Sequence, residues 1–112
     1  MIDPKALIQA VQTAEYFGFY PMAGATIDSE GNICPLAAYI VFHQHFDEWY
    51  DGASPEALVD AHWEDFPPPF RQGFVDTVDG HGPQSVRADA YEQALYALGE
   101  AIVAAAGWVG RA

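Results

Sequence analysis

Basic residues are scarce in this sequence. Only 4 of its 112 residues are Lys or Arg, against 16 Asp or Glu, so the formal net charge is -12. A chain with so few cations cannot neutralise many phosphates, which argues against direct binding of nucleic acid or attachment to anionic lipid. The same imbalance would attract a basic partner.

Cysteine and long apolar runs are scarce as well. Cys34 is the only cysteine, so no intramolecular disulfide can form, which fits a reducing compartment. The N-terminus lacks the cationic start and apolar core of a signal peptide, and no run of about 18 apolar residues is present. We therefore expect a soluble, cytoplasmic protein without a membrane helix.

Core-forming residues, by contrast, are plentiful. Hydrophobic residues make up 51% of the chain and aromatic residues 14%, which is not the composition of a disordered protein. The length suits one domain with one modest core. We expect residues 1–112 to form a single domain.

Capping residues and apolar spacing predict a mainly helical α+β fold. We expect helices over residues 4–17, 35–50, 55–64 and 70–79, and a long last helix that Ser85 caps and Gly107 ends. Turn-forming residues 28–32 predict one small β-hairpin near residues 25–34. The predicted architecture is four to five helices packed around the long C-terminal helix.

Acidic residues crowd the middle of the chain. On the predicted helix 55–64, Glu56, Asp60 and Glu64 follow one another at four-residue steps and so share a face. The residues Asp47, Glu48, Asp51 and Asp65 flank this row. Such a row could bind a positively charged surface of a partner. Alternatively, it is an ordinary solvated helix face, or it reflects a proteome whose proteins are acidic in general.

Histidines raise the question of a metal site. In the predicted helix His43 and His45 diverge, while His43 and Asp47 share a face, and a third ligand would have to come from His62 or His81. Nothing in the spacing fixes that ligand. The simpler interpretation is a hydrogen-bonded histidine pair, so we expect no metal and no cofactor.

Catalytic motifs are missing. We find no Gly-rich phosphate loop, no nucleophile elbow and no zinc-knuckle spacing. Cys34 precedes Pro35 and could sit at a helix N-terminus, where the helix dipole lowers a thiol pKa. One alternative is therefore a small metal-dependent or cysteine enzyme centred on Cys34, His43 and His45. Because the catalytic motifs are missing, the favoured expectation is a protein without catalytic residues.

Aromatic residues gather in two stretches that we expect to lie mostly in the core. The first holds Tyr16, Phe17, Phe19 and Tyr20, and the second holds Trp63, Phe66, Phe70 and Phe74. Any of the second group that is exposed beside the acidic residues would be an anchor for a partner.

These observations favour a non-enzymatic, acidic protein-binding module. We expect a small inhibitor that acts as a nucleic-acid mimic and occupies a basic nucleic-acid-binding surface on its partner, as phage anti-defence proteins such as anti-CRISPR inhibitors do. The proposed contact residues are Asp47, Glu48, Asp51, Glu56, Asp60, Glu64 and Asp65. A further alternative is a structural subunit that assembles through its aromatic surface.

Overall fold

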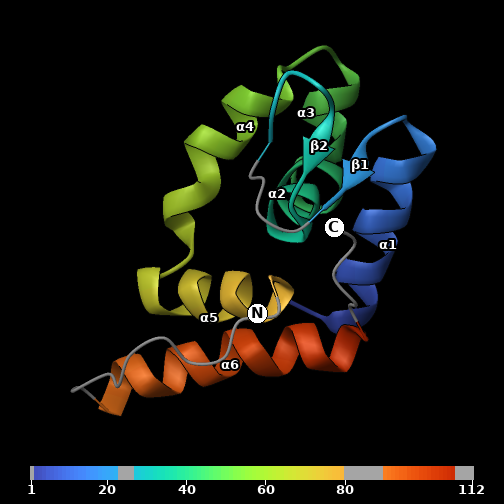
Figure 1. Ribbon diagram of the computed structural model, residues 1–112. Helices are drawn as coiled ribbons and strands as arrows, with labels where there is room; N and C mark the ends of the chain where they lie inside the picture. The colour runs from blue at the N-terminus through green and yellow to red at the C-terminus, as the bar shows by residue number, and fades with distance from the viewer. Residues whose placement is uncertain (1, 23–26, 80–89, 108–112) are drawn as a thin grey trace.

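The computed structural model describes residues 2–22, 27–79 and 90–107 (Figure 1). The chain is mostly helical, with one very small sheet. The α-helices are α1 Pro4–Tyr16, α2 Pro35–Tyr39, α3 Phe46–Tyr50, α4 Pro55–His62, α5 Pro68–Val78 and α6 Ala90–Ala106. A π-helical turn, η1, spans Ile40–Gln44, and a 3-10 turn, η2, spans Trp63–Asp65. The two strands are β1 Tyr20–Pro21 and β2 Asn32–Ile33.

Three helices begin where the sequence predicts, each at a side-chain cap followed by proline. The Asp3 carboxylate accepts a hydrogen bond from the Lys5 amide at 2.9 Å, and the Ser54 hydroxyl accepts one from the Ala57 amide at 3.4 Å. The sulfur of Cys34 accepts from a backbone amide of α2 in the same way. These caps satisfy amide groups that have no partner inside the helix.

The single helix expected over residues 35–50 is interrupted. The π-helical turn follows α2 directly, and the His45 amide donates to the Ile40 carbonyl at 3.0 Å before α3 begins. A π turn accommodates one extra residue and so rotates the next part of the helix about its axis. Phe42 can thereby pack against both Phe19 and Trp49, with ring centroids 5.2 Å and 4.9 Å apart.

The hairpin predicted near residues 25–34 is present only in part, and the two named strands form a different pairing. Strands β1 and β2 are parallel, with Tyr20 opposite Asn32, and the antiparallel part among the described residues is one bridge between Ile27 and Ile33. The turn itself is as predicted, because the Asp28 carboxylate accepts hydrogen bonds from the amides of Glu30 and Asn32. Residues 25 and 26 lie outside the described ranges.

The core surrounds α2, in which all five residues are buried. It is built from α1, α2, η1, α4, α5 and α6. Helix α6 lies along one end of the molecule, where it packs mainly on α5 and also on α1 (Figure 1). The long C-terminal helix is thus present, while the most enclosed element is α2. Ser85, the predicted cap of the C-terminal helix, is not among the described residues.

A membrane-crossing segment needs about 20 consecutive, mostly apolar residues in one helix. None of the helices in the described ranges combines that length with that apolar character.

Candidate functional site

All seven acidic residues proposed as contacts are exposed. Asp47 and Glu48 lie on α3, Asp51 follows it, Glu56 and Asp60 lie on α4, and Glu64 and Asp65 lie on η2. In Figure 1 the chain runs from α3 near the top of the molecule through α4 to the start of α5. The chain therefore presents these carboxylates to solvent in one continuous segment.

Four of the seven carboxylates have a local partner. Glu48 pairs with His45 at 2.9 Å and Asp65 with His62 at 3.0 Å. The Ser54 hydroxyl donates to the Glu56 carboxylate, and Glu64 accepts a 3.3 Å hydrogen bond from Arg71. Exposed pairs of this kind contribute little to stability, about 0 to 1 kcal/mol each. They nevertheless reduce the number of carboxylates that are free for a partner.

The other three carboxylates, on Asp47, Asp51 and Asp60, form no ion pair within the part of the chain that the structure describes. Arg71, the one basic residue close to them in sequence, is already engaged. Its guanidinium pairs with Glu64 and lies 5.7 Å from the centroid of the Trp63 ring. The negative charge of the segment from α3 to η2 is therefore only partly compensated.

The predicted row of three carboxylates is shorter than expected. Helix α4 ends at His62 and the chain continues as a 3-10 turn, so Glu64 does not continue the α-helical face of Glu56 and Asp60. A 3-10 turn has three residues per turn instead of 3.6, which shifts the direction of each later side chain. The prolines that follow Phe66 prevent α4 from continuing as one helix into α5.

Histidines from two separate segments meet beside this surface. His45 immediately precedes α3, and His62 is the last residue of α4. Their rings stack with centroids 3.7 Å apart and planes inclined by 16°. One potential ligand atom from each of His45, Glu48 and His62 lies within 4.8 Å of the others. The structure thus gathers three residues of metal-ligating types at one place.

Sequence reasoning named these residues but grouped them incorrectly. It paired His43 with Asp47, whereas His43 is exposed and stacks on Tyr39 with ring centroids 4.9 Å apart. The π turn is the reason, because it changes the direction of every later residue in this segment. A repeated spacing could have revealed the cluster: His45 and His62 are each followed three residues later by a carboxylate. His81 lies outside the described residues.

Cys34 does not have the properties of a nucleophile. The side chain is buried, and burial raises the pKa of the thiol to about 11, although amides at the start of α2 act in the opposite direction. The expectation that the helix N-terminus would lower this pKa is wrong, because loss of hydration outweighs the helix dipole here. The thiol therefore stays protonated at neutral pH.

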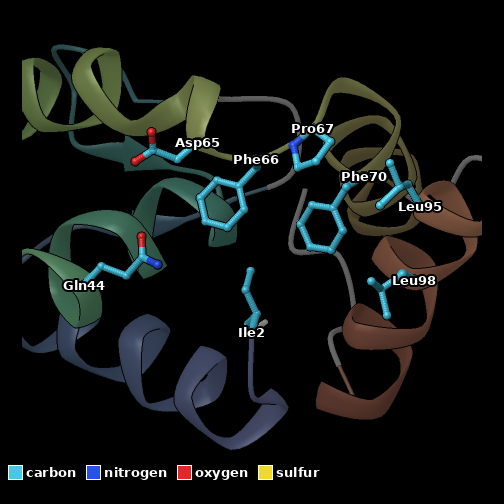
Figure 2. A pocket seen from close by; sticks show the side chains of 8 residues that line it. All are labelled: Ile2, Gln44, Asp65, Phe66, Pro67, Phe70, Leu95 and Leu98. Carbon is cyan, nitrogen blue, oxygen red and sulfur yellow. The ribbon is translucent and has the colours of Figure 1, made fainter. Parts of the chain in front are cut away.

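An apolar pocket of about 300 Å³ opens beside the acidic surface. Its lining comes from the N-terminal segment, η1, the start of α5 and α6, and Figure 2 shows Phe66 and Phe70 facing Ile2 and Leu98 across it. Gln44 and Asp65 supply the polar groups. This volume lies at the lower end of the range for small-ligand pockets.

The aromatic residues divide between core and surface. Phe70 and Phe74 are buried as expected, and Trp63 and Phe66 are half-buried. The first aromatic stretch was expected in the core, but Tyr16, Phe17 and Tyr20 are exposed, while Phe19 packs against the core and one face of the Phe17 ring stacks on Phe42. The exposed three lie at or after the last residue of α1, where the apolar face of that helix no longer directs side chains inward.

We compared the chain with protein-family models, with curated proteins and with solved structures, and none of the three comparisons returned a match.

Proposed function

We propose that this chain is a non-enzymatic binding module that docks on a basic surface of a partner protein. The observation that carries the proposal is the segment from α3 to η2, which exposes seven carboxylates and contains no Lys or Arg, while Arg71 on α5 is already paired with Glu64. Interfaces with complementary charge associate fast and reject partners of the same charge. The contact residues are Asp47, Glu48, Asp51, Glu56, Asp60, Glu64 and Asp65.

The apolar pocket supplies a feature that carboxylates alone lack, namely a place to bury an anchor. Binding energy at interfaces concentrates in a few well-packed side chains, whereas exposed charges contribute mainly to rate and specificity. Asp65 belongs both to the acidic segment and to the pocket wall (Figure 2). The segment of a partner that fits this arrangement carries an apolar side chain next to lysine or arginine.

Basic protein surfaces with several exposed cations commonly bind nucleic acid. A small acidic chain that covers such a surface would act as a nucleic-acid mimic and inhibit the partner, in the manner of phage anti-defence proteins. This proposal predicts that the chain and the nucleic acid exclude each other from the partner.

Capture followed by competition tests the proposal. The tagged chain is used to isolate partners from a native lysate, and the purified pair is then titrated with the nucleic acid that the partner binds. Displacement of the chain, together with an affinity that falls as salt rises, supports the proposal. Formation of a ternary complex at unchanged affinity, or a partner surface without basic residues, would refute it.

A second copy of the chain is the alternative partner that the exposed aromatics favour. Tyr16 is 83% and Tyr50 69% exposed, which is high for large side chains with an apolar body. Sedimentation over a range of concentrations distinguishes the two partners. Self-association that survives high salt would point to an oligomeric subunit held by aromatic contacts.

A further inference from the structure

We infer that His45, Glu48 and His62 form a binding site for a divalent transition-metal ion such as Zn²⁺, with Asp65 as a positioning residue for His62. This inference does not rest on the proposed docking function, although Glu48 and Asp65 belong to both sites. It rests on three features, namely the convergence of two segments, their local geometry and the chemistry of the donor atoms.

The convergence comes from the tertiary fold. His45 lies at the junction of η1 and α3, while His62 ends α4, and these two places are adjacent only because α4 packs against η1. The two imidazole rings face each other at 3.7 Å. Both side chains are mostly shielded, with 19% and 27% of their surface exposed. The fold therefore keeps the two rings close together before an ion arrives, and only a local rearrangement is left for metal binding.

The local geometry is the same in both segments. His45 is the N-cap residue of α3 and His62 that of η2, and neither ring forms a capping hydrogen bond to the backbone. In each case the carboxylate three residues later lies one turn away and contacts the ring Nδ1, at 2.9 Å for Glu48 and 3.0 Å for Asp65. Two histidine-carboxylate units therefore face each other across a short gap.

The donor set fits zinc and related ions. Two imidazoles and one carboxylate are a ligand set of zinc sites that keep a fourth position open for water. A second carboxylate that accepts a hydrogen bond from a ligating histidine fixes the orientation of its ring, and Asp65 is placed to do this for His62. Mg²⁺ and Ca²⁺ prefer oxygen donors, so the imidazoles select against them.

The site must contract when the ion binds. The three donor atoms now lie within 4.8 Å of one another, whereas tetrahedral coordination with bonds of about 2.0–2.1 Å places donors about 3.3 Å apart. Parallel stacked rings do not direct their lone pairs at one point, so the rings turn out of the stack as they ligate the ion. Glu48 is exposed and moves from the His45 ring to the metal.

Metal binding to the purified full-length chain tests the inference directly. We expect titration with Zn²⁺ or Co²⁺ to show one ion per chain, a raised unfolding temperature, and a Co²⁺ absorption spectrum of a four-coordinate site. Excess Mg²⁺ should not compete. The variants His45→Ala, His62→Ala and Glu48→Gln should each bind at least about 100-fold more weakly, and Asp65→Asn about 10- to 100-fold more weakly.

Two variants outside the cluster are matched controls. His43→Ala removes an exposed histidine that stacks on Tyr39, and Asp60→Asn removes an exposed carboxylate of α4 that is not part of the cluster. Both should bind the metal as the parent chain does. Glu48→Gln alters only an exposed side chain, so it tests the site even if a histidine variant unfolds.

Three results would overturn the inference. The first is no binding of Zn²⁺ or Co²⁺ at micromolar concentration, and the second is equal weakening by His43→Ala. The third is displacement of the ion by Mg²⁺, which would show general attraction of cations to an acidic surface. None of these measurements involves a partner protein. A negative result would therefore refute the metal site without bearing on the docking proposal.

Discussion

The phenol of Tyr96 donates a 2.6 Å hydrogen bond to the buried carboxylate of Asp76 and so connects α6 to α5. The Gln72 side chain donates to the other carboxylate oxygen. A buried carboxylate is tolerated only when such donors replace its hydration. The pair therefore fixes the position of α6 along α5.

Removal of this phenol should destabilise the fold. We expect Tyr96→Phe to lower the free energy of unfolding by about 1.5 to 3 kcal/mol, because it leaves an oxygen of the buried carboxylate without its donor. Urea denaturation measures the change. Tyr16→Phe is the matched control, since Tyr16 is 83% exposed, and its effect should stay within about 0.5 kcal/mol. Equal effects of the two variants would contradict this account of the pair.

Glycine sets the distance between α5 and α6. A Cβ atom on Gly99 would lie 2.6 Å from the backbone nitrogen of Phe74 and closer still to the Phe70 carbonyl, and one on Gly73 would collide with the Tyr96 carbonyl. In an ordinary helix, glycine-to-alanine replacement stabilises by about 1 kcal/mol. Here we expect the opposite sign for Gly99→Ala, with a loss of about 1 to 3 kcal/mol as the helices are forced apart.

The sign of the effect is the test. Ala97→Gly, at an exposed position of the same helix, measures the intrinsic helix preference alone and should cost about 1 kcal/mol. Chemical denaturation of both variants and the parent gives the two values. A stabilised Gly99→Ala variant would show that the helices do not approach each other this closely.

Local chemistry was sufficient to predict where α1 and α4 begin. Asp3 and Ser54 cap α1 and α4 with side chains that reach their own helix, so no distant residue is needed. The turn at Asp28 was predictable for the same reason, since its hydrogen bonds stay within five residues. Capping and turn formation are properties of short sequences.

Features that depend on tertiary packing were not predictable. The π turn before His45 occurs together with the packing of Phe42 against Trp49, which the spacing of apolar residues alone does not reveal. The stacking of His45 on His62 requires α4 to fold back against η1. The parallel pairing of β1 and β2 likewise joins segments on both sides of the predicted turn.

Cys34 should make stability depend on pH in the alkaline range. Burial raises the pKa of its thiol from 9.0 to about 11, so between these values the unfolded chain loses the proton while the folded chain keeps it. The free energy of unfolding therefore falls as pH rises through this range and is unaffected by this group below it. The shift corresponds to about 2 to 3 kcal/mol.

Comparison with Cys34→Ser isolates this effect. Serine does not ionise in this range and can also cap α2, whereas Tyr39, whose pKa burial also raises, titrates in both proteins. Urea denaturation at about pH 8 and about pH 10.5 should show a steeper loss for the parent chain. The folded chain should also resist thiol reagents at neutral pH. Rapid labelling of the native protein would show that the thiol is accessible.

Charge reversal on α4 and after α3 should weaken docking on a basic partner. Asp51 and Asp60 are exposed and form no ion pair in the described ranges, so Asp51→Lys with Asp60→Lys alters the surface without breaking an internal contact. We expect the dissociation constant at low salt to rise at least about tenfold. The dependence of affinity on salt should also become shallower, because fewer favourable charge pairs remain to be screened.

The matched control changes the net charge by the same amount at a different place. Glu30 lies in the turn before β2 and Glu100 on α6, both outside the acidic segment. Glu30→Lys with Glu100→Lys should leave affinity nearly unchanged if the contact is local. If both double variants weaken binding equally, the total charge of the chain, and not the α3–η2 surface, determines the interaction.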